Sequence, residues 1–341
     1  MIRIFLCLLF CFNFSYAQSL QNLDFGTDTT FDIISWNIEW FPKNNNTPNL
    51  VREILEKLNA DIYALQEIED TTLLKQVVAN IPYYECHFES FDYGGLAYIY
   101  NSNTVQVNSL HEIFFSQQYH NAFPRAPKIF NCSFGDQEYI ILNNHFKCCG
   151  DGFLDITNYT DEEHRRLQAV SFLKQYIDNN YSDKKVILLG DLNDDLSDNI
   201  ENNVFEEFIL DSLNFTFVDL FISQGSSLNW SFPNWPSHLD HILISNELFA
   251  MFQHPASLVS VIKIDDYMQN WSEYDANVSD HRPIGLKLYF NNNISLTGEK
   301  TIYKRHIKVL DLFGRETDII KNKLLLYIYD DGTVEKKIIL N

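Results

Sequence analysis

The sequence is poor in glycine and proline, which number 12 and 9 among 341 residues. This scarcity excludes collagen-like chains and disordered chains rich in glycine and proline. With 45% hydrophobic residues, the chain can bury the core of one large domain or two of ordinary size. Positive charge is also scarce, because 25 Lys and Arg oppose 46 Asp and Glu. Proteins that grip nucleic acid through phosphates alone are usually basic, so this chain needs a local positive patch or a bound cation to approach a polyanion.

Long apolar runs are missing except at the N-terminus, which reads MIRIFLCLLFCFNFSYAQ. Arg3, the apolar stretch 4–14 and Ala17 before Gln18 form the pattern of a secretory signal peptide. We therefore predict a signal peptide at residues 1–17 and an exported protein, secreted or at the cell surface. The apolar stretch is shorter than the roughly 20 residues of a membrane-spanning helix, so we expect no stable membrane insertion.

Cysteine is also infrequent, and two of the six lie in the predicted signal peptide. The other four are Cys86, Cys132, Cys148 and Cys149. An oxidising compartment makes one or two disulfides plausible, and the sequence leaves their pairing open. A zinc site is disfavoured because the adjacent pair lacks C-x-x-C spacing.

Strand and helix patterns alternate along most of the chain. The predicted strands are 31–40, 61–67, 96–101, 138–146, 184–191, 238–245 and 281–290, and the predicted helices are 49–60, 73–81 and 162–180. This alternation indicates an α/β protein with helices outside sheets. Residues 291–300 are polar and linker-like, and 308–340 read as short strands with a DDGT hairpin turn. The tail differs in charge, since 18–295 hold 39 acidic and 15 basic residues whereas 296–341 hold seven and nine.

Polar residues gather where the predicted strands begin or end. Asn37 and Glu67 end the first two strands, and Asp280 with His281 precedes the last. His145, Asp191, Asn193 and Asp240 occupy similar positions on other strands. Sites in α/β proteins form beyond strand termini, so we expect one convergent site rather than a series of unrelated turns.

The residue types at these positions indicate a reaction. Carboxylates and an amide suit a hard divalent cation, with Mg²⁺ expected first and Mn²⁺ or Ca²⁺ as alternatives. Histidines beside aspartates suit proton transfer. Phosphodiester hydrolysis uses both kinds of group, because a metal neutralises phosphate charge and a base activates water.

The motifs SWNIEWF, ALQEIED, GDLNDD, SHLDHILIS and SDHRPIGL, in this order, resemble the endonuclease/exonuclease/phosphatase superfamily with the deoxyribonuclease-I-like fold. The resemblance spans about residues 31–290. It implies a catalytic domain at 18–295 with a four-layer αββα sandwich, two sheets face to face with helices outside. Five ordered motifs make chance similarity improbable.

Carried over residue by residue, the resemblance implies a role for each position. Glu67 matches the main metal ligand, Asn37 the asparagine beside metal and phosphate, and Asp280 a metal-linked aspartate. The implied catalytic residues are His145, Asp191, Asn193, Asp240 and His281, with Asp240 paired to His281. Arg125 in FPRAP looks like a phosphate-contacting arginine. The acidic partner of His145 stays open, and Glu89 is one candidate.

Other polar residues receive structural interpretations. His241 faces away from Asp240 if the strand is regular, so we interpret it as structural. Asp194, Asp195 and Asp198 are expected to close the loop after the strand. A structural calcium ion held by Asp151 and Asp155 is an alternative to a solvated loop at 148–164.

The tail, KVLDLFGRE…LLLYIYDDGTVEKKIIL, resembles the C-terminal sorting domain of the type IX secretion system in Bacteroidetes. We therefore assign 296–341 as a small β-rich sorting module that contacts the secretion machinery. A β appendage without an export role is the alternative.

These observations predict an exported, metal-dependent phosphodiester hydrolase, a monomer, acting on extracellular DNA or RNA as an endonuclease. The alternatives are the same chemistry on a sphingomyelin or phosphoinositide headgroup, and a catalytically inactive surface module. Trp230, Phe232 and Trp235 fit either base stacking or an apolar rim. Nucleic acid also requires a positive patch, for which the candidates are Arg125, Lys128, Lys147, Arg165 and Arg166.

Overall fold

The computed structural model describes residues 19–88, 95–290, 306–310, 323–329 and 334–338, together with Arg315 and Thr317. The chain divides into two compact units, residues 1–292 and residues 293–341. The expected signal peptide and the DDGT turn lie outside the described residues.

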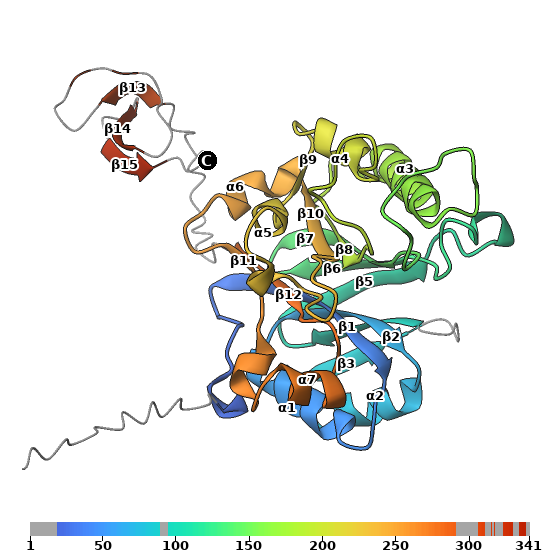
Figure 1. Ribbon diagram of the computed structural model, residues 1–341. Coiled ribbons are helices and arrows are strands. Elements are labelled where there is room, and N and C mark those ends of the chain that lie inside the picture. The colour runs from blue at the N-terminus through green and yellow to red at the C-terminus, as the bar shows by residue number, and fades with distance from the viewer. Residues whose placement is uncertain are drawn as a thin grey trace, which may run out of the picture. The chain divides into compact units, whose positions relative to one another are not determined.

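The first unit contains two six-stranded sheets packed face to face (Figure 1). The first sheet has the order β11 (Leu258–Val261), β12 (Ile284–Tyr289), β1 (Thr30–Phe41), β2 (Ile62–Ile68), β4 (Gly95–Asn101), β3 (Tyr84–His87). The second has the order β5 (Val105–Glu112), β6 (Lys128–Phe134), β7 (Gln137–His145), β8 (Val186–Asp191), β10 (Asp240–Ser245), β9 (Phe215–Phe217). The pairs β1–β2 and β7–β8 are parallel, and the other neighbours are antiparallel.

Helices form the two outer layers (Figure 1). The first sheet is covered by α1 (Thr47–Leu58), α2 (Thr71–Val78) and α7 (Trp271–Asn277), and the second by α3 (Glu162–Asn180) and α4 (Glu206–Leu210). The short helices are α5 (Leu220–Ser223), α6 (Phe249–Phe252), η1 (Leu20–Asn22), η2 (Gln117–Tyr119), η3 (Ser227–Asn229), η4 (Asn246–Leu248) and η5 (Ile264–Tyr267). The expected four-layer αββα sandwich is therefore confirmed. Within the described ranges, none of these helices has the length and apolar character needed to cross a bilayer.

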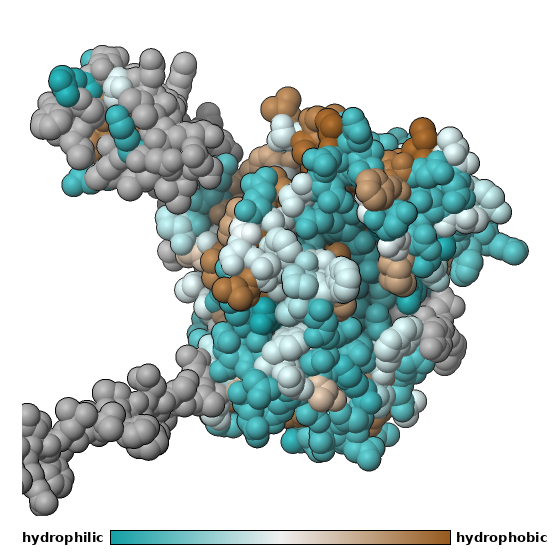
Figure 2. Space-filling model, in the orientation of Figure 1, coloured by the Kyte–Doolittle hydropathy of each residue, from teal (hydrophilic) through white to brown (hydrophobic). Residues whose placement is uncertain are grey.

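Strand β1 shows why the layers form. Phe31 and Ile33 belong to the apolar cluster between the sheets, whereas Ile34 and Trp36 belong to the cluster under the first helical layer. Successive side chains of a strand point to opposite faces, so a strand that is apolar on both faces must be covered on both. On the face drawn in Figure 2, by contrast, hydrophilic residues dominate and hydrophobic ones form small separate patches.

Buried polar contacts hold the two sheets together near the end where β2, β7 and β8 terminate. Gln66 Nε2 donates to Asn143 Oδ1 across the sheet interface at 2.8 Å, and Asn143 Nδ2 donates to the Leu65 carbonyl at 3.0 Å. Gly190 in β8 has φ +140°, and a Cβ there would lie 1.9 Å from the Asn144 carbonyl oxygen. Only glycine allows β7 and β8 to approach this closely, one residue before Asp191.

The second unit is a three-stranded antiparallel sheet of β13 (His306–Leu310), β14 (Leu324–Tyr329) and β15 (Val334–Ile338). Val309, Leu325 and Tyr327 form its small apolar cluster. The expected β-rich C-terminal module is therefore present.

The four cysteines outside the predicted signal peptide are free thiols in this structure, so none of the disulfides considered above is formed among them. Cys86 lies on β3 and Cys132 on β6, which belong to different sheets. Cys148 and Cys149 follow β7 and contact each other through their sulfur atoms.

Candidate active site

The polar strand ends meet at one edge of the sandwich. Asp191, the last residue of β8, is in register with His145 on β7 and with Asp240 on β10. Strand β12 runs antiparallel to β1, so residues 280–281 before it return to the edge where Asn37 lies. The segments expected to converge are thus brought together.

Asn37 connects the two central carboxylates. Its Nδ2 donates to Glu67 Oε1 at 3.0 Å and to Asp191 Oδ2 at 2.9 Å. Its Oδ1 accepts the Glu39 backbone N–H at 3.0 Å. The amide therefore presents its nitrogen to Glu67 and Asp191 and aligns both carboxylates.

Four residues of this edge have backbones in the left-handed region. Glu67 has φ 62°, Asn193 φ 54°, Trp40 φ 51° and Glu39 φ 36°. Non-glycine residues rarely adopt such angles, and strained backbones gather at functional sites. Here the left-handed backbone directs N–H groups toward the site carboxylates. The Trp40 N–H donates to the Glu67 carboxylate at 3.2 Å, and the Asn193 N–H donates to the Asp191 carboxylate at 3.1 Å.

His281 and Asp240 form a buried pair. His281 Nδ1 lies 2.8 Å from Asp240 Oδ2, and its Nε2 lies 3.7 Å from Asp191 Oδ2. Burial alone would lower the pKa of His281, but the carboxylates of Asp240 and Asp191 outweigh it and raise the pKa to about 10. His281 is therefore an imidazolium at neutral pH, with Nδ1–H directed at Asp240.

Asp191 lies at the centre of the cluster. Burial raises its pKa to about 7, the carboxylates of Asp240 and Glu67 add to this effect, and His281 and Asn37 oppose it. Crowded like charges in a buried site favour binding of a cation or a proton. A pKa near 7 also suits a group that exchanges protons with water at neutral pH.

His145 faces the same carboxylates from the other side. Its Nε2 lies 3.5 Å from Asp191 Oδ2 and 3.7 Å from Glu67 Oε1. Burial lowers its pKa well below the usual value, and the positive charges of Arg125 and His281 lower it further, so His145 is neutral. Within the described part of the chain its Nδ1 has no hydrogen-bond partner, and the candidate Glu89 lies outside that part.

Asp280 borders the cluster, and Arg125 lies near enough to lower the pKa of His145, although it is not among the residues that line the cleft. Arg125 is half-buried and, among the residues described, forms no hydrogen bond or ion pair. Asp280 lines the same cleft, and its backbone N–H donates to Glu39 Oε2 at 2.8 Å. Asp280 is not in the two close groups around Asp191, which are Glu67–His145–Asp191 and Asp191–Asp240–His281.

Glu39 was missed by the sequence interpretation. Burial raises the pKa of its carboxyl to about 7, Lys43 opposes this shift through an ion pair, and Asp280 adds to it. The only sequence signal was its position two residues after Asn37 in SWNIEWF.

The cluster opens into a cleft of about 670 Å³. Of the three aromatic residues expected near the site, Phe232 and Trp235 line the cleft, and the Phe232 ring lies 4.8 Å from the His281 ring between centroids. Trp230 is not among the lining residues, and its Nε1 donates to the Ile222 carbonyl at 3.0 Å. Carboxylates dominate the rest of the lining. They are Glu67, Asp151, Glu163, Asp191, Asp194, Asp195, Asp198 and Asp280.

Asp194 does more than close its loop, contrary to the expectation from the sequence. It is buried and accepts from Arg166 Nε at 2.7 Å, because the buried guanidinium requires a charge partner. Asp195 does close the loop, since its Oδ1 accepts from the Ser197 N–H and hydroxyl. Burial and the charges of Asp194 and Asp195 raise the pKa of Asp198 to about 7.

The positive patch considered for nucleic acid is not formed as expected. Lys128 is fully buried, with Nζ 2.8 Å from the Leu96 carbonyl oxygen, and Arg166 is buried against Asp194 and Glu163. Lys147 and Arg165 bind the carbonyls of Cys148 and Asn121. Of the five candidates, Arg125 alone forms no hydrogen bond or ion pair within the described structure, and Arg165 has a carbonyl rather than a carboxylate as its partner.

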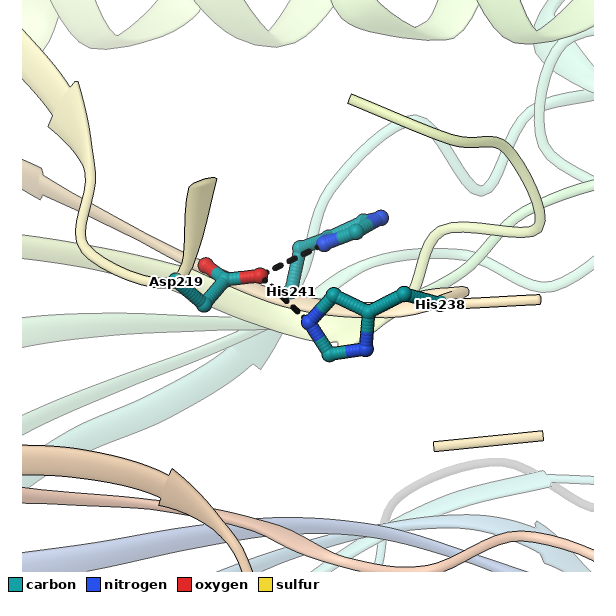
Figure 3. Close-up of side chains that lie close together, drawn as sticks. All are labelled: Asp219, His238 and His241. Atoms are coloured by element: carbon teal, nitrogen blue, oxygen red, sulfur yellow. Dashed lines mark hydrogen bonds and ion pairs between the residues drawn. The ribbon is translucent and has the colours of Figure 1, made fainter. Parts of the chain in front are cut away.

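Asp219, His238 and His241 form a separate buried group (Figure 3). Asp219 Oδ2 lies 2.7 Å from His241 Nδ1 and 3.0 Å from His238 Nε2. His241 Nε2 faces the Asp194 carbonyl at 2.8 Å, so both of its ring nitrogens face acceptors. His241 thus points away from the cleft, as its strand position indicated, and secures the loop after β8.

The calcium alternative receives no geometric support. Asp151 Oδ1 accepts the Phe153 N–H, and Asp155 Oδ1 accepts the Thr157 N–H and hydroxyl. Both aspartates therefore close local turns, and neither belongs to a close group of three ligand residues within the described chain.

The cluster of carboxylates and histidines fits a hard divalent cation. Glu67 and Asp191 offer carboxylate oxygens within 4.8 Å of each other and of His145. Oxygen donors of this kind suit Mg²⁺, Mn²⁺ or Ca²⁺. The donor set leaves the identity of the ion open.

Several solved structures of other proteins share the fold described above. D. rerio TDP2 complexed with single strand DNA product is 16% identical, with 77% of this chain and 100% of that chain covered and a TM-score of 0.57. The human Nocturnin catalytic domain with bound sulfate is 17% identical, with 77% and 94% covered and a TM-score of 0.53. The Bacteroides thetaiotaomicron mannosyl-6-phosphatase is 16% identical, with 76% and 100% covered and a TM-score of 0.52. No curated protein matches the chain.

The two mixed sheets, their helical layers and the cleft define a protein of the deoxyribonuclease-I-like class. Residues 34–281 match the model of the Endonuclease/Exonuclease/phosphatase family, and the chain belongs to that family. Enzymes of this superfamily are metal-dependent phosphodiesterases, phosphatases and nucleases, which supports a phosphoester hydrolase at that general level.

Proposed function

We propose that the protein is an exported, divalent-metal-dependent phosphodiester hydrolase. The observation that carries the proposal is the convergence of Glu67, His145, Asp191 and His281 on one cleft, with Asp240 buried behind His281. Two histidines in opposite protonation states around shared carboxylates form a proton-transfer centre. Export rests on residues 1–17 and on the sorting module proposed at 296–341.

The residues divide the chemistry among them. Glu67, with Asn37 and Asp280 nearby, would hold the cation, for which Mg²⁺ is the first candidate. When bound, the ion would supply positive charge to neutralise a phosphate oxygen. Asp191 and Asn193 orient the attacking water, and Asp191 accepts its proton because its pKa lies near 7.

The histidines and Arg125 act on the phosphate. His281 donates from Nε2, since Asp240 engages Nδ1 and the imidazolium persists at neutral pH. His145 is neutral and accepts or relays a proton beside Asp191. Arg125 binds a phosphate oxygen with its uncommitted guanidinium.

Nucleic acid is the first substrate class we propose, with DNA or RNA cut internally. Trp235, which is 79% exposed, and Phe232 provide stacking surfaces at the cleft. A structural neighbour was crystallised with a single-stranded DNA product, which supports the same class.

A small phosphoester, such as a lipid headgroup, is the second substrate class. The carboxylate lining favours it, because Arg166, the arginine among the described lining residues, is already paired with carboxylates and a polyanion would be repelled. A substrate with a single phosphate carries less negative charge than a polyanion and is therefore repelled less by the carboxylates. The small, separate apolar patches in Figure 2 give no broad membrane-docking surface on that face, so a free headgroup ester fits better than a bilayer.

A substrate panel separates these classes. Purified protein with Mg²⁺ or Mn²⁺ is assayed on plasmid DNA, RNA, sphingomyelin and a generic phosphodiester, with His281→Ala as the blank for contaminating nucleases. We expect cleavage of nucleic acid that the variant lacks. Cleavage confined to sphingomyelin or the generic ester removes the nuclease proposal and keeps the mechanism. If neither protein cleaves any of the substrates, the enzyme proposal is wrong and the inactive surface module is supported.

A further inference from the structure

Two adjacent thiols face the catalytic cleft, and nothing in the proposed hydrolysis uses them. Cys148 and Cys149 line the cleft together with His145 and Asp191. The Cys149 thiol donates to the Cys148 sulfur at 3.0 Å. Cys149 is exposed and Cys148 is partly buried, so small reagents in solution reach the pair.

The backbone around these thiols is fixed by buried groups. Arg166 Nη1 donates to the Lys147 carbonyl at 2.8 Å and to the Cys149 carbonyl at 2.7 Å. Cys149 has φ 71° and Gly150 φ 112°, and a Cβ on Gly150 would lie 2.2 Å from Glu163 Oε1. The loop therefore has little freedom to separate the two sulfur atoms.

We propose that Cys148 and Cys149 form a site of reversible oxidation, closing to a vicinal disulfide at the rim of the cleft. The oxidant is a low-molecular-weight disulfide. Two exchange steps convert the two thiols and one oxidant disulfide into the vicinal disulfide and two small thiols. Sulfur atoms held in contact favour the second, intramolecular step over a stable mixed disulfide.

The bond is expected to be easily reduced. Adjacent Cα atoms lie about 3.8 Å apart across a trans peptide, which is shorter than the usual separation in disulfides. Strained, exposed disulfides are the labile ones, in contrast to structural disulfides of secreted proteins. The hydrogen bond to Cys148 and partial burial raise the pKa of Cys149, so the thiol is the resting form and equilibration is slow.

Cys86 and Cys132 act as internal controls. Cys132 is fully buried, and burial raises the pKa of both thiols far above the usual value. Both should stay reduced under conditions that oxidise the adjacent pair.

The test uses the full chain equilibrated in mixtures of glutathione and glutathione disulfide. Free thiols are then blocked with a maleimide in denaturant, and peptides are analysed by mass spectrometry. We expect the peptide with Cys148 and Cys149 to lose both adducts in oxidising mixtures and to regain both after reduction. Cys86 and Cys132 should keep theirs throughout. The readout needs no enzymatic activity, so it stands or fails independently of the proposed function.

A single-thiol variant sharpens the result. In Cys148→Ser the remaining Cys149 has no adjacent thiol, so it should accumulate a mixed disulfide with glutathione. Wild-type protein that also accumulates glutathione adducts on this peptide, or keeps both free thiols in every mixture, overturns the proposal. Bonds from Cys148 or Cys149 to Cys86 or Cys132 overturn it as well.

Discussion

His281 Nδ1 lies 2.8 Å from Asp240 Oδ2, and this buried contact joins the start of β10 to the loop before β12. The two residues are 41 positions apart in sequence. The contact determines which nitrogen of the ring faces the cleft, because Nδ1 is occupied and only Nε2 remains for a substrate. It also keeps the ring protonated, together with Asp191.

Replacing Asp240 by Asn should therefore change the pH profile as well as the rate. Without the carboxylate the pKa of His281 falls, and the ring loses its proton at a lower pH. We expect kcat/KM to fall about 100-fold at pH 8, within the usual range for lost acid–base assistance, and less at pH 6. Rate profiles from pH 5 to 10 measure this. A uniform loss at every pH would indicate that Asp240 only maintains the fold.

Asp191→Asn should stabilise the metal-free protein while abolishing activity. Burial raises the folded pKa of Asp191 to about 7, above the value of 3.8 for a free aspartate. A raised carboxyl pKa costs stability above pH 3.8, and the cost is complete above about pH 7. Thermal unfolding in chelator at pH 8 should show a Tm about 2–4 °C higher, as expected for roughly 1 kcal/mol in a domain of this size. The gain should vanish near pH 4, and an unchanged or lower Tm at pH 8 contradicts the prediction.

Glu67→Gln should weaken Mg²⁺ binding and so reduce the thermal stabilisation that Mg²⁺ gives the protein. A cation that binds the folded state alone raises Tm, because it stabilises that state by RT ln(1 + c/Kd), where c is its free concentration. Saturating Mg²⁺ should therefore stabilise the wild type, and Glu67→Gln should need roughly 100-fold more Mg²⁺ for the same shift if the lost ligand contributes about 3 kcal/mol. Glu138→Gln, at the surface beside Lys184, is the matched control and should behave as the wild type. Equal Mg²⁺ responses in all three proteins would exclude Glu67 as a ligand.

Gly190→Ala tests the close contact of β7 and β8 beneath the site. The added Cβ would lie 1.9 Å from a carbonyl oxygen, at a φ of +140°. We expect destabilisation of about 3 kcal/mol, the upper end for overpacking, or failure to fold. Gly152→Ala is the control, since its φ is +80° but no atom lies within 4 Å of the added Cβ. It should cost about 1 kcal/mol from backbone strain alone. Similar losses for both variants, measured by denaturant unfolding, would show that the contact does not matter.

Much of the site was predictable because its parts are local. Asn37 and Glu67 lie near the ends of buried strands that the sequence marks clearly, and Asp191 is the last residue of another. Helix α3 was predicted with its observed bounds, 162–180. The apolar period of a strand or helix is local information, and strand ends tend to meet at sheet edges. The five ordered motifs then predicted the fold, through their resemblance to a known superfamily.

The errors concern contacts that depend on tertiary structure. Strand β5, VQVNSLHE, was not predicted because it is an edge strand and five of its eight residues are polar. Lys128 and Arg166 were considered for a surface patch, yet both are buried. Lys128 donates to a carbonyl oxygen, and Arg166 donates to a carboxylate, of residues that are distant in sequence. The left-handed backbone at Glu67 has no signal in composition or periodicity. Such features arise only when distant segments meet.

The most direct test of the account is the rate of hydrolysis of a generic phosphodiester as a function of Mg²⁺ and Mn²⁺ concentration. Wild type, His281→Ala and His254→Ala are compared, and the last is a matched control whose ring stacks on Tyr289. The account predicts saturable, chelator-sensitive hydrolysis by the wild type and by His254→Ala, with a loss of about 100-fold or more in His281→Ala. Metal-independent hydrolysis, or equal rates for all three proteins, would contradict it.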